Sequence, residues 1–277
     1  MSHDVHEVFA LRYAHHDRRA PDNYVFGDPH DAPEPFAYFV WLIRGAQGTI
    51  VVDTGFDQAM ASKRARTFVQ PVGEGLAALG VDPEQVTDIV VTHLHYDHAG
   101  NHELFPRARY HLQDVEMAYA TGRCMSHPHA RVPFEADDVA AMVRKVYEGR
   151  VVFHDGDEQL VPGVTLHRIG GHSRGLQSLR VKTRRGHIVL ASDASHLYSH
   201  FQTGRVFPIV DSVSDVLEGY RTVRRLADSD AHVIPGHDPQ VVERYPAAAP
   251  GLEGWVVRLD VEPGAGAAGL AGAAEQP

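Results

Sequence analysis

The chain has 277 residues, of which 43% are hydrophobic and 22% are charged, so it can bury the core of one large soluble domain. Its formal net charge of -10 argues against a nucleic-acid substrate, because a nuclease attracts its polyanion through basic surface, and favours an uncharged or modestly charged small molecule. The single cysteine, Cys124, excludes an internal disulfide and disfavours a structural zinc site built from thiolates.

The location of the protein is predicted from features that the sequence lacks. The first residues, Met1 to Glu7, hold no basic leader followed by an apolar core. The most apolar stretch, 36–43, is too short to span a bilayer. We therefore expect a cytoplasmic protein that does not enter a membrane.

Short runs rich in β-branched and aromatic residues predict strands, and these runs alternate with segments of helical periodicity. In chain order, the predicted strands are 5–13, 37–44, 49–53, 88–92, 108–112, 164–169, 178–182, 187–192 and 231–234. The predicted helices are 72–79, 114–120, 135–148 and 212–227, the last with an apolar stripe typical of core packing. This mixture favours a layered α/β fold.

Two segments fall outside that plan. Residues 15–35 are rich in His, Asp, Arg and Pro, and we expect a long loop or arm over the surface, near the pocket or a subunit contact. Residues 263–277 are mostly Gly and Ala, which bury too little surface to offset their ordering entropy, so we expect a disordered tail. Residues 1–262 then form a single domain.

The strongest local signal is the motif His93-Leu94-His95-Tyr96-Asp97-His98, directly behind the predicted strand 88–92. Imidazole nitrogen and carboxylate oxygen are natural ligands for a dication such as zinc. In a chain with 20 histidines, a lone histidine is more often a surface or core residue than a ligand. Four donors within six residues are different, because burying them together without a metal would be costly. The motif therefore predicts a metal site.

Further candidate ligands follow other predicted strands. His172, Asp193 and His237 each come just after such a strand, and Asp53 ends the strand 49–53 in the same way. Ligand sites of sheet proteins gather at the edge where strands end. Each of these residues alone is weak support, but their joint order indicates one shared site.

This order of residues resembles the metallo-β-lactamase superfamily of hydrolases, with an early Asp, an H-x-H-x-D-H loop, then a His, an Asp and a His. The resemblance covers about residues 49–237 and implies a four-layered αββα sandwich with the metal site at the edge between two sheets. It also implies two divalent metals, zinc first, with manganese, cobalt or iron as alternatives. The implied ligands are His93, His95 and His172 for the first metal, Asp97, His98 and His237 for the second, and Asp193 as a bridge. Asp53 would support the site by orienting a ligand.

Within the superfamily, residues 93–101, 171–179 and 192–195 most resemble the N-acyl-homoserine lactonase group, known for quorum quenching, and related lactonases. His95 disfavours the oxygen-reducing flavodiiron members, which have Glu there, and Asp193 disfavours the true zinc β-lactamases, which lack that acid. The resemblance implies a hydrolase that opens a lactone ring, with N-acyl-homoserine lactone as one candidate, through a hydroxide that bridges the metals. Asp97 would orient that hydroxide or pass a proton.

One residue departs from the lactonase pattern. Lactonases of this group commonly carry a tyrosine three residues after the bridging Asp, and this chain has His196. A histidine can also donate to a carbonyl oxygen, although its titration near neutrality would add pH dependence. Tyr198, two residues on, is the alternative candidate. The departure leaves the acyl-homoserine substrate open more than it affects hydrolysis.

The insertion 114–149 is the predicted substrate cap, because its side chains could line an apolar pocket; ordinary core or surface placement is the alternative. These side chains are Met117, Tyr119, Met125, His127, His129 and Phe134. Other functions that stay open are a thioester hydrolase of the glyoxalase II kind, another dinuclear-metal esterase or phosphoesterase, and a non-catalytic metal-binding module. The expected partner is a small lactone or ester, with neither nucleic acid nor membrane, and a homodimer is left open.

Overall fold

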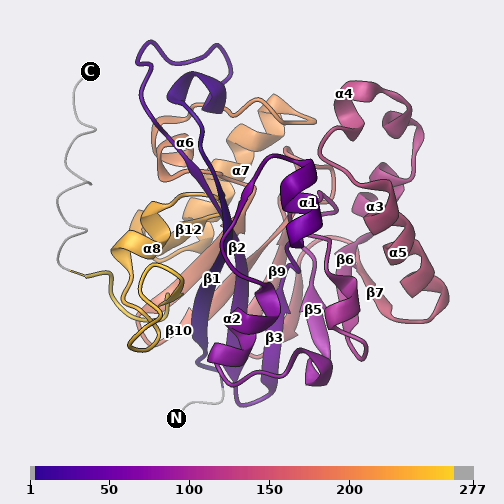
Figure 1. The fold of residues 1–277 in the computed structure, drawn as a ribbon, viewed down its shortest axis with the longest axis vertical. Coiled ribbons are helices and arrows are strands. Elements are labelled where there is room, and N and C mark those ends of the chain that lie inside the picture. The colour runs from indigo at the N-terminus through magenta and orange to yellow at the C-terminus, as the bar shows by residue number, and fades with distance from the viewer. Residues whose placement is uncertain (1–3, 265–277) are drawn as a thin grey trace.

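Two β-sheets pack face to face in the computed structural model, which describes residues 4–264 (Figure 1). The larger sheet has eight strands, in the order β13-β1-β2-β3-β5-β6-β7, with β4 paired to β1. The smaller has five strands, in the order β12-β11-β10-β9-β8. The predicted disordered tail lies, from residue 265 on, outside the described residues.

The strands of the larger sheet are β1 (Glu7–His16), β2 (Phe36–Gly45), β3 (Gly48–Val52), β4 (Thr67–Phe68), β5 (Asp88–Val90), β6 (Arg109–Gln113), β7 (Val151–His154) and β13 (Val256–Arg258). Strands β3, β5, β6 and β7 are parallel neighbours. Their carboxyl ends therefore meet at one edge of the sheet, where side chains from separate loops can converge.

The strands of the smaller sheet are β8 (Glu158–Val161), β9 (Val164–Arg168), β10 (Gln177–Thr183), β11 (Gly186–Ser192) and β12 (Val233–Pro235). Strand β10 is antiparallel to β9 and to β11, and β11 is parallel to β12. Strands β9, β11 and β12 thus share one direction, and the loops that follow them leave the sheet at the same edge.

Alternation along β2 shows how the layers are held. Trp41 and its neighbours on one face of the strand join the core between the two sheets, while Val40 and Leu42 join a second core beneath helices. Among those helices, α2 contributes Leu76 and α5 contributes Met142. Both faces of the larger sheet are therefore buried.

The helices that flank the larger sheet and its insertion are α1 (Gln58–Lys63), α2 (Val72–Ala78), α3 (Asp114–Ala120), α4 (Pro128–Arg131) and α5 (Ala136–Tyr147). The remaining helices are α6 (Tyr198–Thr203), α7 (Val213–Leu226) and α8 (Gln240–Arg244). Arg180 points away from the inter-sheet core and donates from Nε to the carbonyl of Leu226 at 2.8 Å, so α7 lies over the outer face of the smaller sheet. The predicted layered α/β sandwich with two sheets is confirmed.

All the predicted strands and helices are present within a few residues of their expected limits. The elements that the sequence did not indicate are short ones, such as β4, α1, α6 and α8, in which too few residues repeat to show a period. No helix in the described part of the chain is long and apolar enough to cross a bilayer.

The arm, residues 15–35, begins as the end of β1 and then folds over α6. The Tyr24 hydroxyl lies 2.8 Å from Ser199 Oγ, and His200 Nε2 lies 3.1 Å from the carbonyl of Asn23. Figure 1 shows this segment in indigo beside α6. The arm is therefore anchored next to the edge at which the candidate ligands gather.

Candidate metal centre

The candidate ligands come together from both sheets at one edge of the sandwich. The 93–98 motif follows β5, whereas His172, Asp193 and His237 follow β9, β11 and β12. All seven are buried, and Asp97 is the most exposed of them at 8%. The predicted convergence of these residues is thus present in the structure.

The first group consists of His93, His95 and His172 with one oxygen of Asp193. His95 Nδ1 lies 3.0 Å from His93 Nε2 and 2.9 Å from His172 Nε2. Asp193 Oδ2 lies 3.1 Å from His172 Nε2. One donor atom from each residue lies within 4.8 Å of the others, so the four atoms surround a common point.

The second group consists of Asp97, His98 and His237, and it meets the other oxygen of Asp193. Asp193 Oδ1 lies 3.0 Å from His237 Nε2 and 3.4 Å from His98 Nε2. Asp97 Oδ2 lies 3.6 Å from each of the same two nitrogens. The Asp193 carboxylate therefore stands between the two groups, with one oxygen toward each.

Hydrogen bonds on the far side of the imidazoles turn the ligand nitrogens inward. His172 Nδ1 lies 2.7 Å from the carbonyl of Ile209, and His237 Nδ1 lies 2.9 Å from that of Ala37, so each Nδ1 donates and each Nε2 keeps its lone pair. Such anchoring fixes the tautomer that a metal needs.

Asp53 anchors the ring of His98 in the same way, through a hydrogen bond to its Nδ1. Its Oδ2 lies 2.7 Å from His98 Nδ1, and its Oδ1 accepts from the Thr92 amide at 2.7 Å. The Thr92 hydroxyl lies 2.9 Å from Asp53 Oδ2 and 2.9 Å from Ser192 Oγ. Asp53 and Ser192 both hold positive φ angles, 63° and 47°, a strained conformation that persists where the surroundings demand it.

Two of the donors, His93 and Asp193, have the protonation states that a dication requires. Burial, followed by the charge of His98, holds the pKa of His93 well below its ordinary value, so its imidazole is neutral. Burial alone would raise the pKa of Asp193, but the surrounding histidines, His237 foremost, lower it well below its ordinary value. His98 Nε2 and Asp193 Oδ1 are buried and have no hydrogen-bond partner among the described residues. These unpaired atoms fit a metal.

Close approach of the β12 loop depends on Gly236. A Cβ at this position would lie 2.6 Å from Asp193 Oδ1, so a larger residue would displace the carboxylate. Glycine is therefore required where the loop that carries His237 passes the bridging acid.

Glu116 of α3 contacts the ligand loops, although no sequence motif marks it. Its buried carboxylate accepts from the Leu94 amide at 2.9 Å, from the Gly175 amide at 2.8 Å and from the Ser173 hydroxyl. It thereby joins the loop of His93 and His95 to the loop of His172. The signal that could have revealed it is a carboxylate on an otherwise apolar helix face.

His196 lines the cavity above the ligands. Its Nε2 lies 3.2 Å from Asp193 Oδ2, and neither ring nitrogen has a hydrogen-bond partner in the described chain. The ring stacks on Phe207, with centroids 3.8 Å apart. This position brings His196 into a third possible ligand group, with Asp193 and His237.

Tyr198, the alternative candidate, does not line this cavity, which corrects the expectation that it reaches the site. Because α6 begins here, the Tyr198 amide donates to Asp238 Oδ2 at 2.9 Å and the side chain turns into the core. The guanidinium of Arg244 lies over its ring, 3.9 Å from the centroid. Of the two candidates, His196 is the one beside the ligands.

Two small hollows of 110 Å³ and 170 Å³ lie over the ligands, and both are lined by His95 and His172. Both are bounded by Val132 and Pro133 of the insertion, and the second also by Tyr119 and His129. Phe134 packs edge-on against His95, 4.5 Å between centroids. A larger cavity of 1130 Å³ lies between α1, α4 and α5, and none of the candidate ligands lines it.

The other predicted cap residues do not reach the hollows. Met117 and Met125 pack against the core beneath the insertion, and His127 is exposed. The insertion therefore contributes a few residues to the roof of the site, and the remainder are structural.

Comparison with known proteins agrees with this geometry. Residues 33–237 match the family model of the Metallo-beta-lactamase superfamily. An N-acyl homoserine lactonase of Bacillus cereus is 30% identical over 217 residues, which cover 72% of this chain and 81% of that protein.

Two solved structures share the fold. The crystal structure of a quorum-quenching N-acyl homoserine lactone lactonase has a TM-score of 0.72 at 22% identity, covering 86% of this chain and 94% of that one. AidC, described as a dizinc quorum-quenching lactonase in complex with a product, has a TM-score of 0.65 at 15% identity, covering 86% and 89%.

Proposed function

The chain belongs to the metallo-beta-lactamase superfamily, and from this membership we propose that it is a metal-dependent hydrolase that opens a lactone ring. The observation that carries the proposal is the Asp193 carboxylate, which presents one oxygen to each of two His/Asp groups. Relatives named N-acyl homoserine lactonases support lactones as the substrate class. The small size of the two hollows suits a compact ring.

The proposed cofactor is a pair of divalent cations, zinc in the first instance, as in the lactonase described as dizinc. His93, His95 and His172 would hold one, Asp97, His98 and His237 the other, and Asp193 would touch both. Bound there, such ions supply Lewis-acid polarisation of a carbonyl and lower the pKa of a bound water.

Asp97 is placed to move the proton in this reaction. Its carboxylate borders the 110 Å³ hollow, and its backbone carbonyl accepts from the Tyr13 hydroxyl at 2.6 Å, which fixes the loop. As water adds to the lactone carbonyl carbon and the ring C–O bond breaks, one proton must pass from the water to the ring oxygen. Asp97 can accept that proton and return it.

His196 is placed to steady the carbonyl oxygen. Burial lowers the pKa of His196 well below its ordinary value despite the opposing charge of Asp193, so the ring is a neutral donor of one N–H. Its packing against Phe207 fixes its direction before substrate arrives. A donor that needs no reorganisation is worth most as charge develops on the oxygen.

Reconstitution tests this function. Protein stripped with EDTA is reloaded with zinc, manganese, cobalt or iron and assayed with N-hexanoyl-homoserine lactone, δ-valerolactone, S-lactoylglutathione and a phosphodiester. We expect ring opening that depends on the added metal and exceeds turnover of the other two classes. Thioester or phosphodiester turnover without any lactone opening would overturn the proposal.

A further inference from the structure

Three arginines line the 110 Å³ hollow above the candidate ligands: Arg18, Arg64 and Arg66. Arg64 forms an ion pair with Glu135, whose Oε1 lies 2.6 Å from Arg64 Nη2. Arg18 and Arg66 form no ion pair with a carboxylate among residues 4–264. Two guanidinium groups that line the hollow without an ion-pair partner stand out in a chain of net charge -10.

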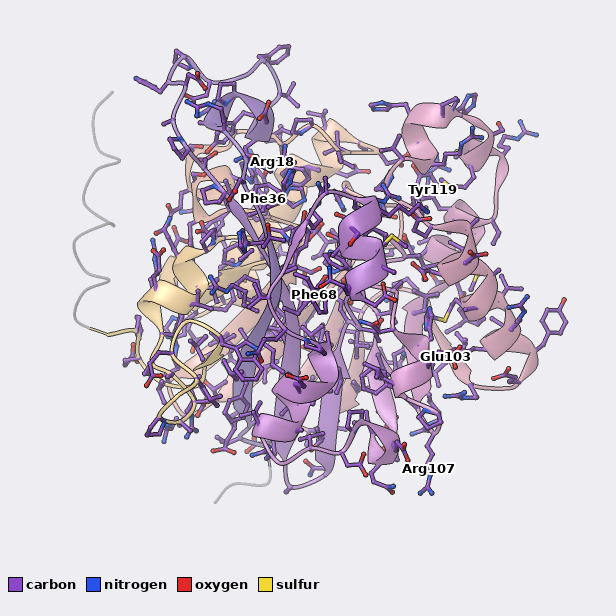
Figure 2. The ribbon with its side chains drawn as sticks, in the orientation of Figure 1. Arg18, Phe36, Phe68, Glu103, Arg107 and Tyr119 are labelled. Atoms are coloured by element: carbon purple, nitrogen blue, oxygen red, sulfur yellow. The ribbon has the colours of Figure 1, made fainter. Side chains whose placement is uncertain are left out.

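Arg18 reaches the hollow from the arm. Its Nε donates to Asn23 Oδ1 at 2.6 Å, and its Nη2 donates to the backbone carbonyl of Asp22, so its partners are uncharged groups. The guanidinium lies over the ring of Phe36, 4.6 Å from the centroid, and Phe36 stacks on His237. Figure 2 shows Arg18 and Phe36 close together on the side of the arm. No described group accepts from Arg18 Nη1.

Arg66 reaches the hollow from the segment before β4. Its Nε donates to the Tyr96 hydroxyl at 3.0 Å and its Nη1 to the carbonyl of Arg64 at 2.7 Å. Among the described residues nothing accepts from Nη2. The carboxylate whose charge reaches Arg66 is Asp97, which is itself a proposed ligand. Once Asp97 binds a cation, Arg66 has no counter-charge of its own.

The positive charges of Arg18 and Arg66 also act on the neighbouring His16. Its pKa falls to about 4, first through burial and then through the charges of Arg66 and Arg18. Burial lowers the pKa of the half-buried Arg18 guanidinium, so its charge is costly, and the cost is relieved when an oxyanion completes its hydrogen bonds. An acyl chain against the same wall would leave both charges desolvated.

We propose that Arg18 and Arg66 form a subsite for a carboxylate, so that the preferred substrate is a small lactone that carries a carboxylate beside its ring. This inference rests on the proposed lactone hydrolysis. The free Nη1 of Arg18 and Nη2 of Arg66 are the donors, and the fork geometry of guanidinium matches a carboxylate. The size of the hollow limits the group to a short one.

A matched pair of lactones tests the subsite in turnover. The zinc-loaded protein is assayed with 5-oxotetrahydrofuran-2-carboxylate and with its carboxamide, which has the same shape and no charge. We expect kcat/KM to be at least about tenfold higher for the acid, as one charge-assisted hydrogen bond would give. Equal values for the two lactones would overturn the inference and leave lactone hydrolysis intact.

Substitutions assign that preference to the two arginines. Arg18→Gln and Arg66→Gln should each shrink the ratio of acid to carboxamide, chiefly through a higher KM for the acid. Arg18→Lys and Arg66→Lys keep the positive charge and should keep part of the ratio. A loss caused by the missing charge is thereby distinguished from a loss caused by misfolding. Arg221→Gln, an exposed arginine on α7 paired with Glu218, should keep the full ratio. An unchanged ratio in the Arg18→Gln/Arg66→Gln double variant would assign the preference to the metals and overturn the inference.

A binding measurement separates the subsite from the reaction. Tetrahydrofuran-2-carboxylate and its carboxamide have no ring bond that water can cleave, and both can be titrated calorimetrically into the zinc-loaded protein. We expect the acid to bind about tenfold tighter and the double variant to lose this difference. If the protein opened no lactone but still bound the acid more tightly, the subsite would be supported and the proposed function would be wrong. Equal binding of the two compounds would overturn the subsite.

Discussion

The imidazole of His196 lies against the ring of Phe207 with 3.8 Å between centroids and 26° between planes. Packing therefore fixes this ring, since no hydrogen bond from the described residues does so. The position three residues after Asp193 is therefore occupied by a ring that packing holds in place and that can donate one N–H.

Replacing this ring tests its part in the reaction. His196→Phe should lower kcat on the order of a hundredfold, as loss of one preorganised donor does, because Phe keeps the contact with Phe207 and removes the N–H. Metal analysis should still find two ions per chain. Loss of one ion would contradict this role and make His196 a ligand, which the third ligand group allows.

Asp193 should be indispensable for metal binding. Asp193→Ala removes both oxygens that face the two groups, so we expect metal content to fall and nearly all turnover to vanish. Asp230→Ala, an exposed acid paired with Arg224, is the matched control and should retain both properties. Wild-type turnover in Asp193→Ala would defeat the two-metal centre.

Glu116 should act through the ligands that it positions. Glu116→Gln keeps the size of the side chain but places an amide group against donors, so the loops of His95 and His172 should lose their alignment. We expect zinc affinity, measured by competition with a chelating dye, to fall by about 10–100-fold. Glu74→Gln, on the exposed face of α2, should leave the affinity unchanged. A zinc affinity equal to that of the wild type in Glu116→Gln would show that the residue does not position the ligands.

The sequence predicted the ligand positions because each follows a strand, and strands of like direction end at one edge. It could not predict the part of Glu116, whose partners are backbone amides 22 and 59 positions away. It placed Tyr198 near the site because of sequence proximity, and the start of α6 turns that ring away. That Arg18 and Arg66 line the same hollow depends on how the arm packs, which no local pattern encodes.

The free energy of unfolding should depend on pH through the carboxyl group of Asp138, in the first turn of α5. Burial, and then the charges of Glu135 and Asp137, raises the pKa of Asp138 to about 7 in the folded protein, above its ordinary value of 3.8. A raised carboxyl pKa means that folding loses stability as pH rises from about 4 to about 7 and stays lower above that range.

Asp138→Asn mimics the neutral carboxyl and should therefore stabilise the protein, more at pH 8 than at pH 5.5. Thermal unfolding of variant and wild type at both pH values gives the two differences. Asp114→Asn, which replaces an exposed acid in the first turn of α3, serves as the control. A larger gain at pH 5.5 would contradict the raised pKa.

Metal removal should lower thermal stability as well as activity. At a free concentration a hundred times Kd, one bound ion stabilises the fold by about 2.7 kcal/mol, which corresponds to roughly 5–10 °C in a chain of this size. We expect chelation to lower the unfolding midpoint by at least that amount and zinc to restore it. A midpoint unaffected by chelation would show that the ligand loops are held without an ion.

The Thr92 hydroxyl contacts Asp53, at the end of a strand in one sheet, and Ser192, at the end of a strand in the other. The candidate ligands are divided between the same two halves. An ion bound among them would thus cross-link the sandwich in a chain whose single cysteine offers no disulfide. Withdrawal of that ion should lower the stability of the fold, and because proteolysis acts on the unfolded chain, the abundance of the protein in a cell should fall together with its activity.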